Sequence, residues 1–288
     1  MKTVEEWKGV LRAALKEAMR SRKPDVVSVL RETLGAIDNA EAADASAAPS
    51  VQAGVIAGGV SGLGAGEVPR KVLSPVEVHA IIEREVQERR DASVAGSLSK
   101  LIAEASACTL CAKQLPHAPR PVFKVQRGAR VLLVGQAPGA KVHASGTPWD
   151  DASGDHLREW LGVDRATFDS DLFAILPMGF CWPGRREGGD LPPRPECAPA
   201  WHDRLRAHLP KVELTLLIGL YAQDHYLRDR QRDSLTESVR AFETYLPEML
   251  PLPHPSWRSK LWMKKNPWFA RRVLPMLQRR IAALVISG

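Results

Sequence analysis

The sequence has no long apolar run and few cysteines. None of its apolar segments is long enough to span a bilayer, which argues against a membrane protein. The first twenty residues carry acidic side chains and lack the apolar centre of a signal peptide. An apolar content of 44% is sufficient for a full core, so we expect a soluble, cytoplasmic protein of prokaryotic type, without a membrane partner.

The first third of the chain carries no net charge. Residues 1–100 hold 14 Lys and Arg and 14 Asp and Glu, so the whole net charge of +7 lies in residues 101–288. A basic segment joined to a neutral one favours a polyanionic partner such as nucleic acid, while a basic surface that only keeps the protein in solution is the alternative.

The neutral part predicts amphipathic helices. An apolar stripe runs through residues 4–19, and Pro24 is typical of the start of a second helix. Residues 41–69 are mostly Ala, Gly, Ser and Val, which predicts a flexible insert. Helix is expected again after Ser74, an N-cap residue followed by Pro75 and by Glu77.

Beyond residue 100, apolar runs alternate with helical stretches. The strands are expected at 131–134, within DLFAILPMGF and within LTLLIGLYAQ, with helices at 154–161, 198–209 and 220–227. This order is typical of a parallel sheet with helices on both faces, whose site lies at the carboxyl ends of the strands. The segments GQAPG and LPHPS follow such ends. GQAPG matches neither the phosphate-binding loop nor the dinucleotide fingerprint.

All four cysteines lie in this second part. Cys108 and Cys111 form a C-x-x-C pair, and Cys181 and Cys197 follow in a proline-rich stretch. In an intracellular chain this set favours a metal site over buried core thiols. The spacing alone leaves zinc and a [4Fe–4S] cluster both open.

Two segments of the chain resemble known families. The stretches VLRETLGAIDNAE and LSPVEVHAIIEREVQERRDA resemble the GatB/YqeY family, a helical domain related to the tail of a transfer-RNA-dependent amidotransferase subunit, over residues 1 to about 92. The C-x-x-C pair, VGQAPG, GTPWDDASG, the two later cysteines and HPSWRS resemble the iron–sulfur, family-four class of the uracil-DNA glycosylase superfamily over about residues 98–284.

These resemblances imply a fold and a domain division. We expect an α/β fold: a three-layer, parallel-sheet glycosylase-like domain at 98–288, preceded by a small all-α domain at 1–95 with its flexible insert. The helical domain implies RNA or a protein as a further partner. A transfer-RNA-related factor is accordingly an alternative function, as is a nucleic-acid-binding module without turnover.

The glycosylase resemblance also implies an enzyme of base excision repair and its site residues. This N-glycosyl hydrolase would remove uracil or a related deaminated base from DNA. Because the base leaves as an anion, a donor at its O2 oxygen stabilises the transition state, and His254 matches that role. Gln136 would orient water, Asp150 or Asp151 could replace a missing base, and a structural [4Fe–4S] cluster is implied at the cysteines. The expected metal ligands are Cys108, Cys111, Cys181 and Cys197. The expected substrate-binding residues are Gly135, Ala137, Pro138, Gly139, Trp149 and Ser256. The expected DNA-binding residues are Trp257, Arg258, Lys260, Lys264 and Lys265.

Two residues depart from the family pattern. Gln136 stands where the family-four class has Glu, and Pro177 stands where an asparagine reads the uracil edge. The sequence therefore leaves the preferred lesion open. Asp190 and Glu187, in the segment GRREGGD, are expected to be solvated.

Overall fold

The computed structural model describes residues 2–42, 70–187 and 189–286, and for residues 91–95 the backbone alone. It divides into two compact units, Met1–Ser93 and Val94–Gly288. The predicted insert at 41–69 lies outside the described residues from position 43 on. No helix in the described parts of the chain is long and apolar enough to cross a membrane.

The first unit is helical, as predicted. It contains α1 (Val4–Arg20), α2 (Pro24–Glu41) and the beginning of α3 (Pro75–Ser106). Pro24 begins α2, and Ser74 and Glu77 exchange the two hydrogen bonds of a capping box before α3. Ile37 and Val78 are fully buried in the small core of this unit. Lys8, also buried, is neutralised by Asp38 at 2.9 Å and Glu41 at 2.7 Å.

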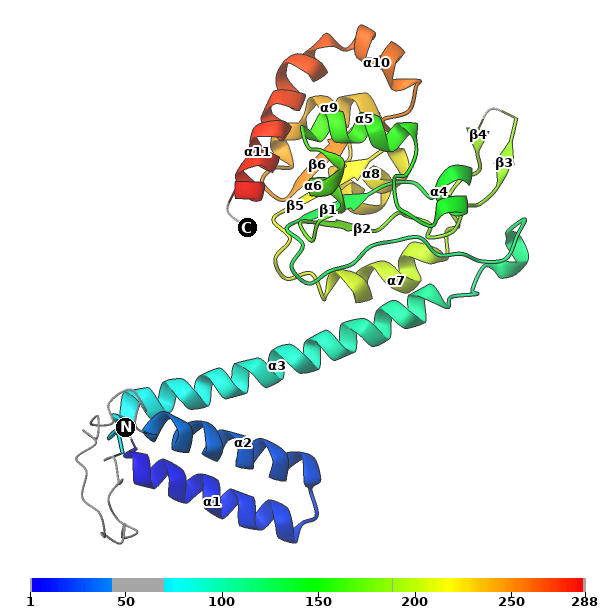
Figure 1. Ribbon diagram of the computed structural model, residues 1–288. Helices are drawn as coiled ribbons and strands as arrows, with labels where there is room; N and C mark the ends of the chain where they lie inside the picture. The colour runs from blue at the N-terminus through cyan, green and yellow to red at the C-terminus, as the bar shows by residue number, and fades with distance from the viewer. Residues whose placement is uncertain (1, 43–69, 188, 287–288) are drawn as a thin grey trace, which may run out of the picture. The chain divides into compact units, whose positions relative to one another are not determined.

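The second unit is built on a parallel sheet of order β2-β1-β5-β6 (Figure 1). Its strands are short and apolar, and each pairs with its neighbours in parallel. The strands are β1 (Val131–Val134), β2 (Phe173–Ile175), β5 (Leu214–Ile218) and β6 (Met249–Leu252). This arrangement confirms the predicted α/β fold.

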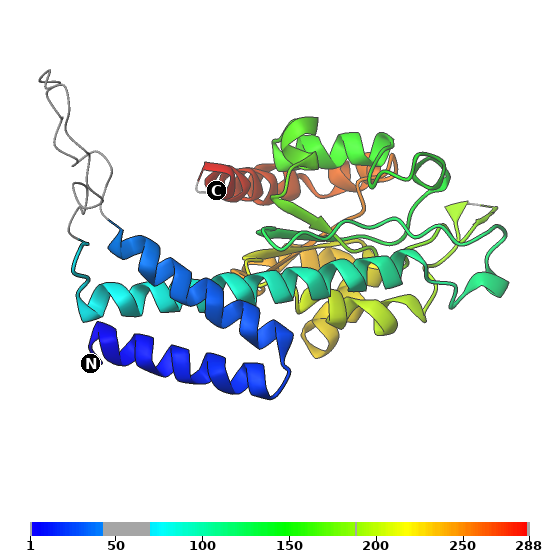
Figure 2. The ribbon, with the colours of Figure 1, turned by 60° about the horizontal axis from the view of Figure 1, so that its bottom comes forward.

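Helices cover both faces of the sheet, because alternate residues of each strand point to opposite sides. The helices of this unit are α4 (Ala140–Ser145), α5 (Ala152–Leu161), α6 (Arg165–Asp169), α7 (Cys197–Arg206), α8 (Leu220–Leu227), α9 (Leu235–Arg240), α10 (Ser259–Lys265) and α11 (Leu274–Ile286). In β1, Val131 and Leu133 pack against α5, α6, α9 and α11, while Leu132 and Val134 pack against α7, α8 and the end of α3. Figures 1 and 2 show α5 and α11 on one side of the sheet and α7 on the other.

Short elements complete the second unit. A small antiparallel hairpin, β3 (Arg185–Arg186) and β4 (Gly189–Asp190), lies between β2 and α7. The turns η2 (Ala112–Gln114), η3 (Arg228–Arg230), η4 (Phe242–Thr244) and η5 (Phe269–Val273) join the larger elements. Two predicted boundaries were wrong by a few residues: α5 begins at Ala152 because Asp151 caps it, and α7 ends at Arg206.

Candidate active site

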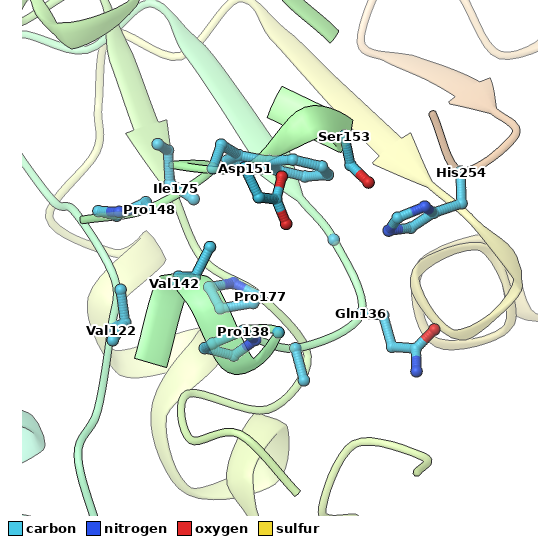
Figure 3. A pocket seen from close by; sticks show the side chains of 14 residues that line it. Val122, Gln136, Pro138, Val142, Pro148, Asp151, Ser153, Ile175, Pro177 and His254 are labelled. Atoms are coloured by element: carbon cyan, nitrogen blue, oxygen red, sulfur yellow. The ribbon is translucent and has the colours of Figure 1, made fainter. Parts of the chain in front are cut away.

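A pocket lies where the strands end, at the edge where sites of parallel sheets form. Figure 3 shows the side chains of Asp151, Ser153 and His254 turned toward the same space. The pocket contains eight of the nine residues predicted to be catalytic or substrate-binding; only Ser256 does not line it. The lining residues are Val122, Gly135, Gln136, Ala137, Pro138, Gly139, Val142, Pro148, Trp149, Asp151, Ser153, Ile175, Pro177 and His254.

His254 follows the end of β6 and forms one wall. Its ring lies 5.8 Å from the Trp149 ring, tilted by 33°. Gly219, at the end of β5, has φ of 88°, and a side-chain carbon there would lie 3.6 Å from His254 Cβ. Burial lowers the pKa of His254, although Asp151 and Asp190 oppose this effect. At neutral pH the imidazole is therefore uncharged and can donate one N–H into the pocket.

The loop after His254 is fixed by hydrogen bonds. His156 Nδ1 donates to the Pro255 carbonyl at 3.2 Å, and the Ser256 N–H donates to the His254 carbonyl at 2.9 Å. The Ser256 carbonyl in turn accepts from Ser259 Oγ at 2.7 Å. Ser256 thus shapes the turn that leads into α10, which explains why it does not line the pocket. His156, on α5, thus holds the loop through its ring.

Trp149 places its ring in the pocket through an unusual backbone. Its φ of 57° is in the left-handed region, which is rare for a bulky residue. A side-chain carbon on Gly154 would lie only 1.8 Å from the Trp149 carbonyl oxygen, so only glycine fits there. On the other side, a carbon on Gly135 would lie 3.0 Å from Trp149 Cζ2. The two glycines therefore allow the ring to lie against the loop after β1.

Gln136 and Pro177 are held by contacts outside the pocket. Gln136 Nε2 donates to the Leu191 carbonyl at 3.2 Å, and the backbone carbonyl of Gln136 accepts from the Gly179 N–H at 3.0 Å. The Pro177 carbonyl accepts from His202 Nε2 at 3.0 Å. Because Pro177 has no side-chain donor, the pocket wall contains no amide at the position where the glycosylase resemblance predicts an asparagine.

Asp151 faces the pocket with one of its carboxylate oxygens engaged. Its Oδ1 accepts from the Gly154 N–H at 2.9 Å and caps α5. The neighbouring Asp150 instead pairs with Arg165 at 3.1 Å, and these hydrogen bonds lower the pKa of Asp150. Of the two aspartates in GTPWDDASG, Asp151 is therefore the one that reaches the pocket.

Two polar residues near the pocket were not predicted. Ser153 lines it from the first turn of α5. Asp190 is exposed, as expected, but its Oδ2 lies 3.5 Å from the position of a side-chain carbon on Gly139. Ser153 lies inside the motif GTPWDDASG, so the motif itself was a signal. Asp190 comes from β4, and its position depends on a contact between distant segments that spacing does not reveal.

The predicted DNA-binding residues lie on and before α10. Trp257 is 73% exposed, and the Arg258 guanidinium lies over its ring, 5.2 Å from the centroid. Lys260, Lys264 and Lys265 are exposed. By contrast, Trp262 and Trp268 pack onto the core. Trp257 is thus the tryptophan of this segment that is available to a partner.

The four cysteines line one narrow cavity, together with Pro121, Phe180, Arg194 and Trp201. Burial raises the pKa of Cys181 to about 11 and that of Cys197 to about 12. Cys197 Sγ accepts from the Phe180 N–H at 3.2 Å. Within the described residues no group of three or more His, Cys, Asp or Glu side chains is arranged to hold a single metal ion. Four thiols around one mostly apolar cavity nevertheless fit the ligand set of an iron–sulfur cluster.

A comparison with known families matches this site-bearing unit. The family model described as the uracil DNA glycosylase superfamily matches residues 123–278, more than half of the chain. The match includes every strand of the parallel sheet, the pocket loops after β1 and β6, and two of the four cysteines. The chain therefore belongs to the uracil DNA glycosylase superfamily.

Proposed function

We propose that this protein is a DNA glycosylase that hydrolyses the bond between deoxyribose and uracil, or a related deaminated base. The observation that carries the proposal is the convergence of His254, Trp149 and Asp151 on one pocket, beside an exposed tryptophan and several cations. Superfamily membership implies DNA as the substrate.

The chemistry requires that the base leave the double helix and enter the pocket. There the Trp149 ring can stack on it, which contributes roughly 1–3 kcal/mol. As the bond breaks, negative charge grows on the base, and the neutral His254 imidazole can donate to its O2 oxygen. Trp257 can fill the gap left in the helix, while the cations of α10 bind phosphates.

Base release tests this function directly. The full-length protein is incubated with single- and double-stranded oligonucleotides that carry uracil, hypoxanthine or xanthine. We expect a free base, detected by mass spectrometry, and an abasic strand that alkali cleaves. The absence of release from all six substrates, under conditions in which the protein binds them, would instead support the alternative function.

That alternative is a nucleic-acid-binding module without turnover. It is favoured by Gln136, which cannot accept a proton, and by Pro177, which cannot read the uracil edge. For the helical unit, the alternative function is binding of RNA or of a protein partner. Binding assays with transfer RNA, compared between the full chain and a variant of the α10 lysines, separate that role from DNA binding by the second unit.

The same proposal includes a [4Fe–4S] cluster held by Cys108, Cys111, Cys181 and Cys197. It is supported by the shared cavity of these four side chains. The bound cluster would be structural, joining the C-x-x-C segment to the loop after β2 and to the start of α7. We expect anaerobically purified protein to be brown and to contain about four irons per chain.

A cysteine variant provides a measurement independent of activity. Cys197→Ala should lose iron and unfold at a lower temperature, because bound metal contributes to folding free energy. A colourless parent with stoichiometric zinc would rule out the cluster while leaving a structural metal in place.

A further inference from the structure

A second carboxylate, that of Asp190, faces a loop that lines the pocket. A side-chain carbon on Gly139 would lie 3.5 Å from Asp190 Oδ2 and 3.8 Å from Asp151 Oδ2, so both carboxylates face the same loop. Gly139 itself lines the pocket. Asp190 and Asp151 also both act electrostatically on His254, which lies in the same pocket. Asp190 is thus part of the local environment of the site, although it comes from the β3–β4 hairpin.

The Asp190 side chain is held in place. Its Oδ1 accepts from Trp182 Nε1 at 3.1 Å, which leaves Oδ2 facing Gly139. The Trp182 ring stacks on His117 with centroids 5.2 Å apart and planes 8° apart. His117 Nε2 also donates to the Trp182 carbonyl at 3.0 Å. The residue that orients Asp190 is therefore fixed at both its backbone and its ring.

Gln136 positions the segment that carries Asp190. Its Nε2 donates to the carbonyl of Leu191, the residue directly after Asp190. A glutamate at position 136 would face that carbonyl with no proton to donate, and the two oxygens would repel each other. The amide that replaces the family's acid therefore serves to hold another acid at the pocket.

Resting on the proposed function, we propose that Asp190 is the base that activates the attacking water. The extruded base would fill the interior of the pocket, and C1′ of its sugar would then lie toward the edge, beside the loop of Gly139 that Asp190 faces. Each carboxylate has one oxygen in a hydrogen bond, Asp151 Oδ1 with the Gly154 N–H and Asp190 Oδ1 with Trp182 Nε1, but Asp190 is the more exposed of the two and is open to water. Asp190 therefore accepts the proton, while Asp151 stabilises the positive charge of the sugar and caps α5.

The step balances without a further reactant. Water oxygen forms the new bond to C1′, and the C1′–N1 bond breaks with its electron pair going to the departing base. Asp190 takes the proton from water, and His254 stabilises the base anion. Transfer of that proton to the base or to solvent then regenerates the carboxylate, leaving free base and an abasic site.

Single-turnover excision by Asp190→Asn, with the full-length protein and its best substrate, tests the assignment. Loss of a general base typically costs about a hundred- to ten-thousandfold in rate. We expect a loss in that range, with unchanged binding of an oligonucleotide that carries an abasic analogue. Asp190→Glu should recover part of the rate. Trp182→Phe, which removes one hydrogen bond and keeps the stacked ring, should cost on the order of tenfold.

Rescue by azide distinguishes a catalytic role of Asp190 from a merely structural one. Because azide attacks C1′ without losing a proton, it should accelerate Asp190→Ala and yield a glycosyl azide, but leave the parent unchanged. Glu187→Gln is the matched control, since it removes an exposed carboxylate from the same hairpin. It should excise at the parental rate.

The outcomes separate this inference from the function on which it rests. An active parent with Asp190→Asn at the parental rate overturns the role of Asp190 and leaves the glycosylase function intact. The same holds if Asp190→Ala is slow but azide does not rescue it. A parent that binds DNA and releases no base overturns both.

Discussion

At the scale of single residues, His254 is the group on which the proposed chemistry depends most. It donates to the base more strongly as negative charge develops, so its removal should affect the transition state and hardly affect binding. His254→Ala should therefore lower single-turnover excision by about a hundred- to a thousandfold. A filter-binding assay with the same uracil-containing strand should give nearly the parental affinity. Parental turnover in this variant would mean that the site is wrongly assigned.

His202 contacts Pro177, which lines the pocket, and its titration affects the stability of the protein. Burial lowers its pKa to about 4, and its ring nitrogens contact the Pro177 carbonyl and the Tyr226 hydroxyl. In the unfolded chain the pKa is about 6.5. Between these values the unfolded state binds more protons, so stability is complete above about pH 6.5 and falls as the pH drops toward 4. The loss should be on the order of 3 kcal/mol.

The matching variant is His202→Gln, whose amide can still donate to Pro177 but does not titrate. Urea unfolding of parent and variant from pH 7.5 to 4.5 checks the effect. We expect a clearly flatter dependence on pH for the variant, even if it is less stable at neutral pH. Parallel curves for the two proteins would assign the acid sensitivity to other groups.

The residues of the site were partly predictable from sequence. His254, Gln136, Trp149 and Asp151 lie in recognisable motifs that follow strands or precede a helix, and strand ends meet at one edge of a parallel sheet. Asp190 could not be predicted because its place depends on Trp182, Gly139 and Gln136, which lie in three separate segments. Asp151 stands three residues before Gly154, which is the spacing of an N-cap, so the hydrogen bond to one of its oxygens could have been expected from the sequence. The motif instead led to the interpretation of Asp151 as a base.

At the scale of elements, the start of α5 controls the pocket. Gly154→Ala would place a carbon 1.8 Å from the Trp149 carbonyl, so the loop must move. We expect a loss of at least 1–3 kcal/mol in unfolding free energy and a displaced Trp149 ring. Gly96→Ala is the control, because a carbon there meets nothing within 4 Å and lies in α3. It should stabilise the protein by up to about 1 kcal/mol. Equal unfolding curves for both variants would contradict this role of the loop.

The elements themselves followed from local signals. Continuous apolar runs predicted β1 and β5, and Pro24 and Ser74 predicted the starts of α2 and α3. The β3–β4 hairpin was not predicted, since strands of two residues carry no periodic pattern. This hairpin carries Asp190. The position of Asp190 beside the pocket could not be predicted because the hairpin itself was not predicted.

At the scale of the whole molecule, charge is divided between the two parts of the sequence. Because the net excess lies entirely in residues 101–288, DNA binding should depend on cations there. Lys264→Ala with Lys265→Ala should weaken binding at every sequence. It should also flatten the slope of log affinity against log salt by about 1.8, since each phosphate contact contributes about 0.9.

The control is a double variant in the first unit that removes the same number of positive charges. Arg12 and Lys16 are both exposed on α1, and replacing both with Ala should leave the slope unchanged. Fluorescence anisotropy over 50–300 mM salt, roughly the range over which phosphate contacts weaken, measures both variants. A change in the α1 variant but not in the α10 variant would place the DNA on the helical unit.

The left-handed backbone of Trp149 has a consequence for stability. The backbone conformation alone would favour glycine or asparagine there, because a bulky residue in that conformation costs on the order of 1–3 kcal/mol. Trp149→Gly relieves this strain but removes a ring that packs on the core, so it should destabilise the protein by less than the roughly 3–5 kcal/mol typical of a truncated tryptophan, and it should abolish excision. In this loop, the chain accepts a strained backbone to keep an aromatic ring beside His254.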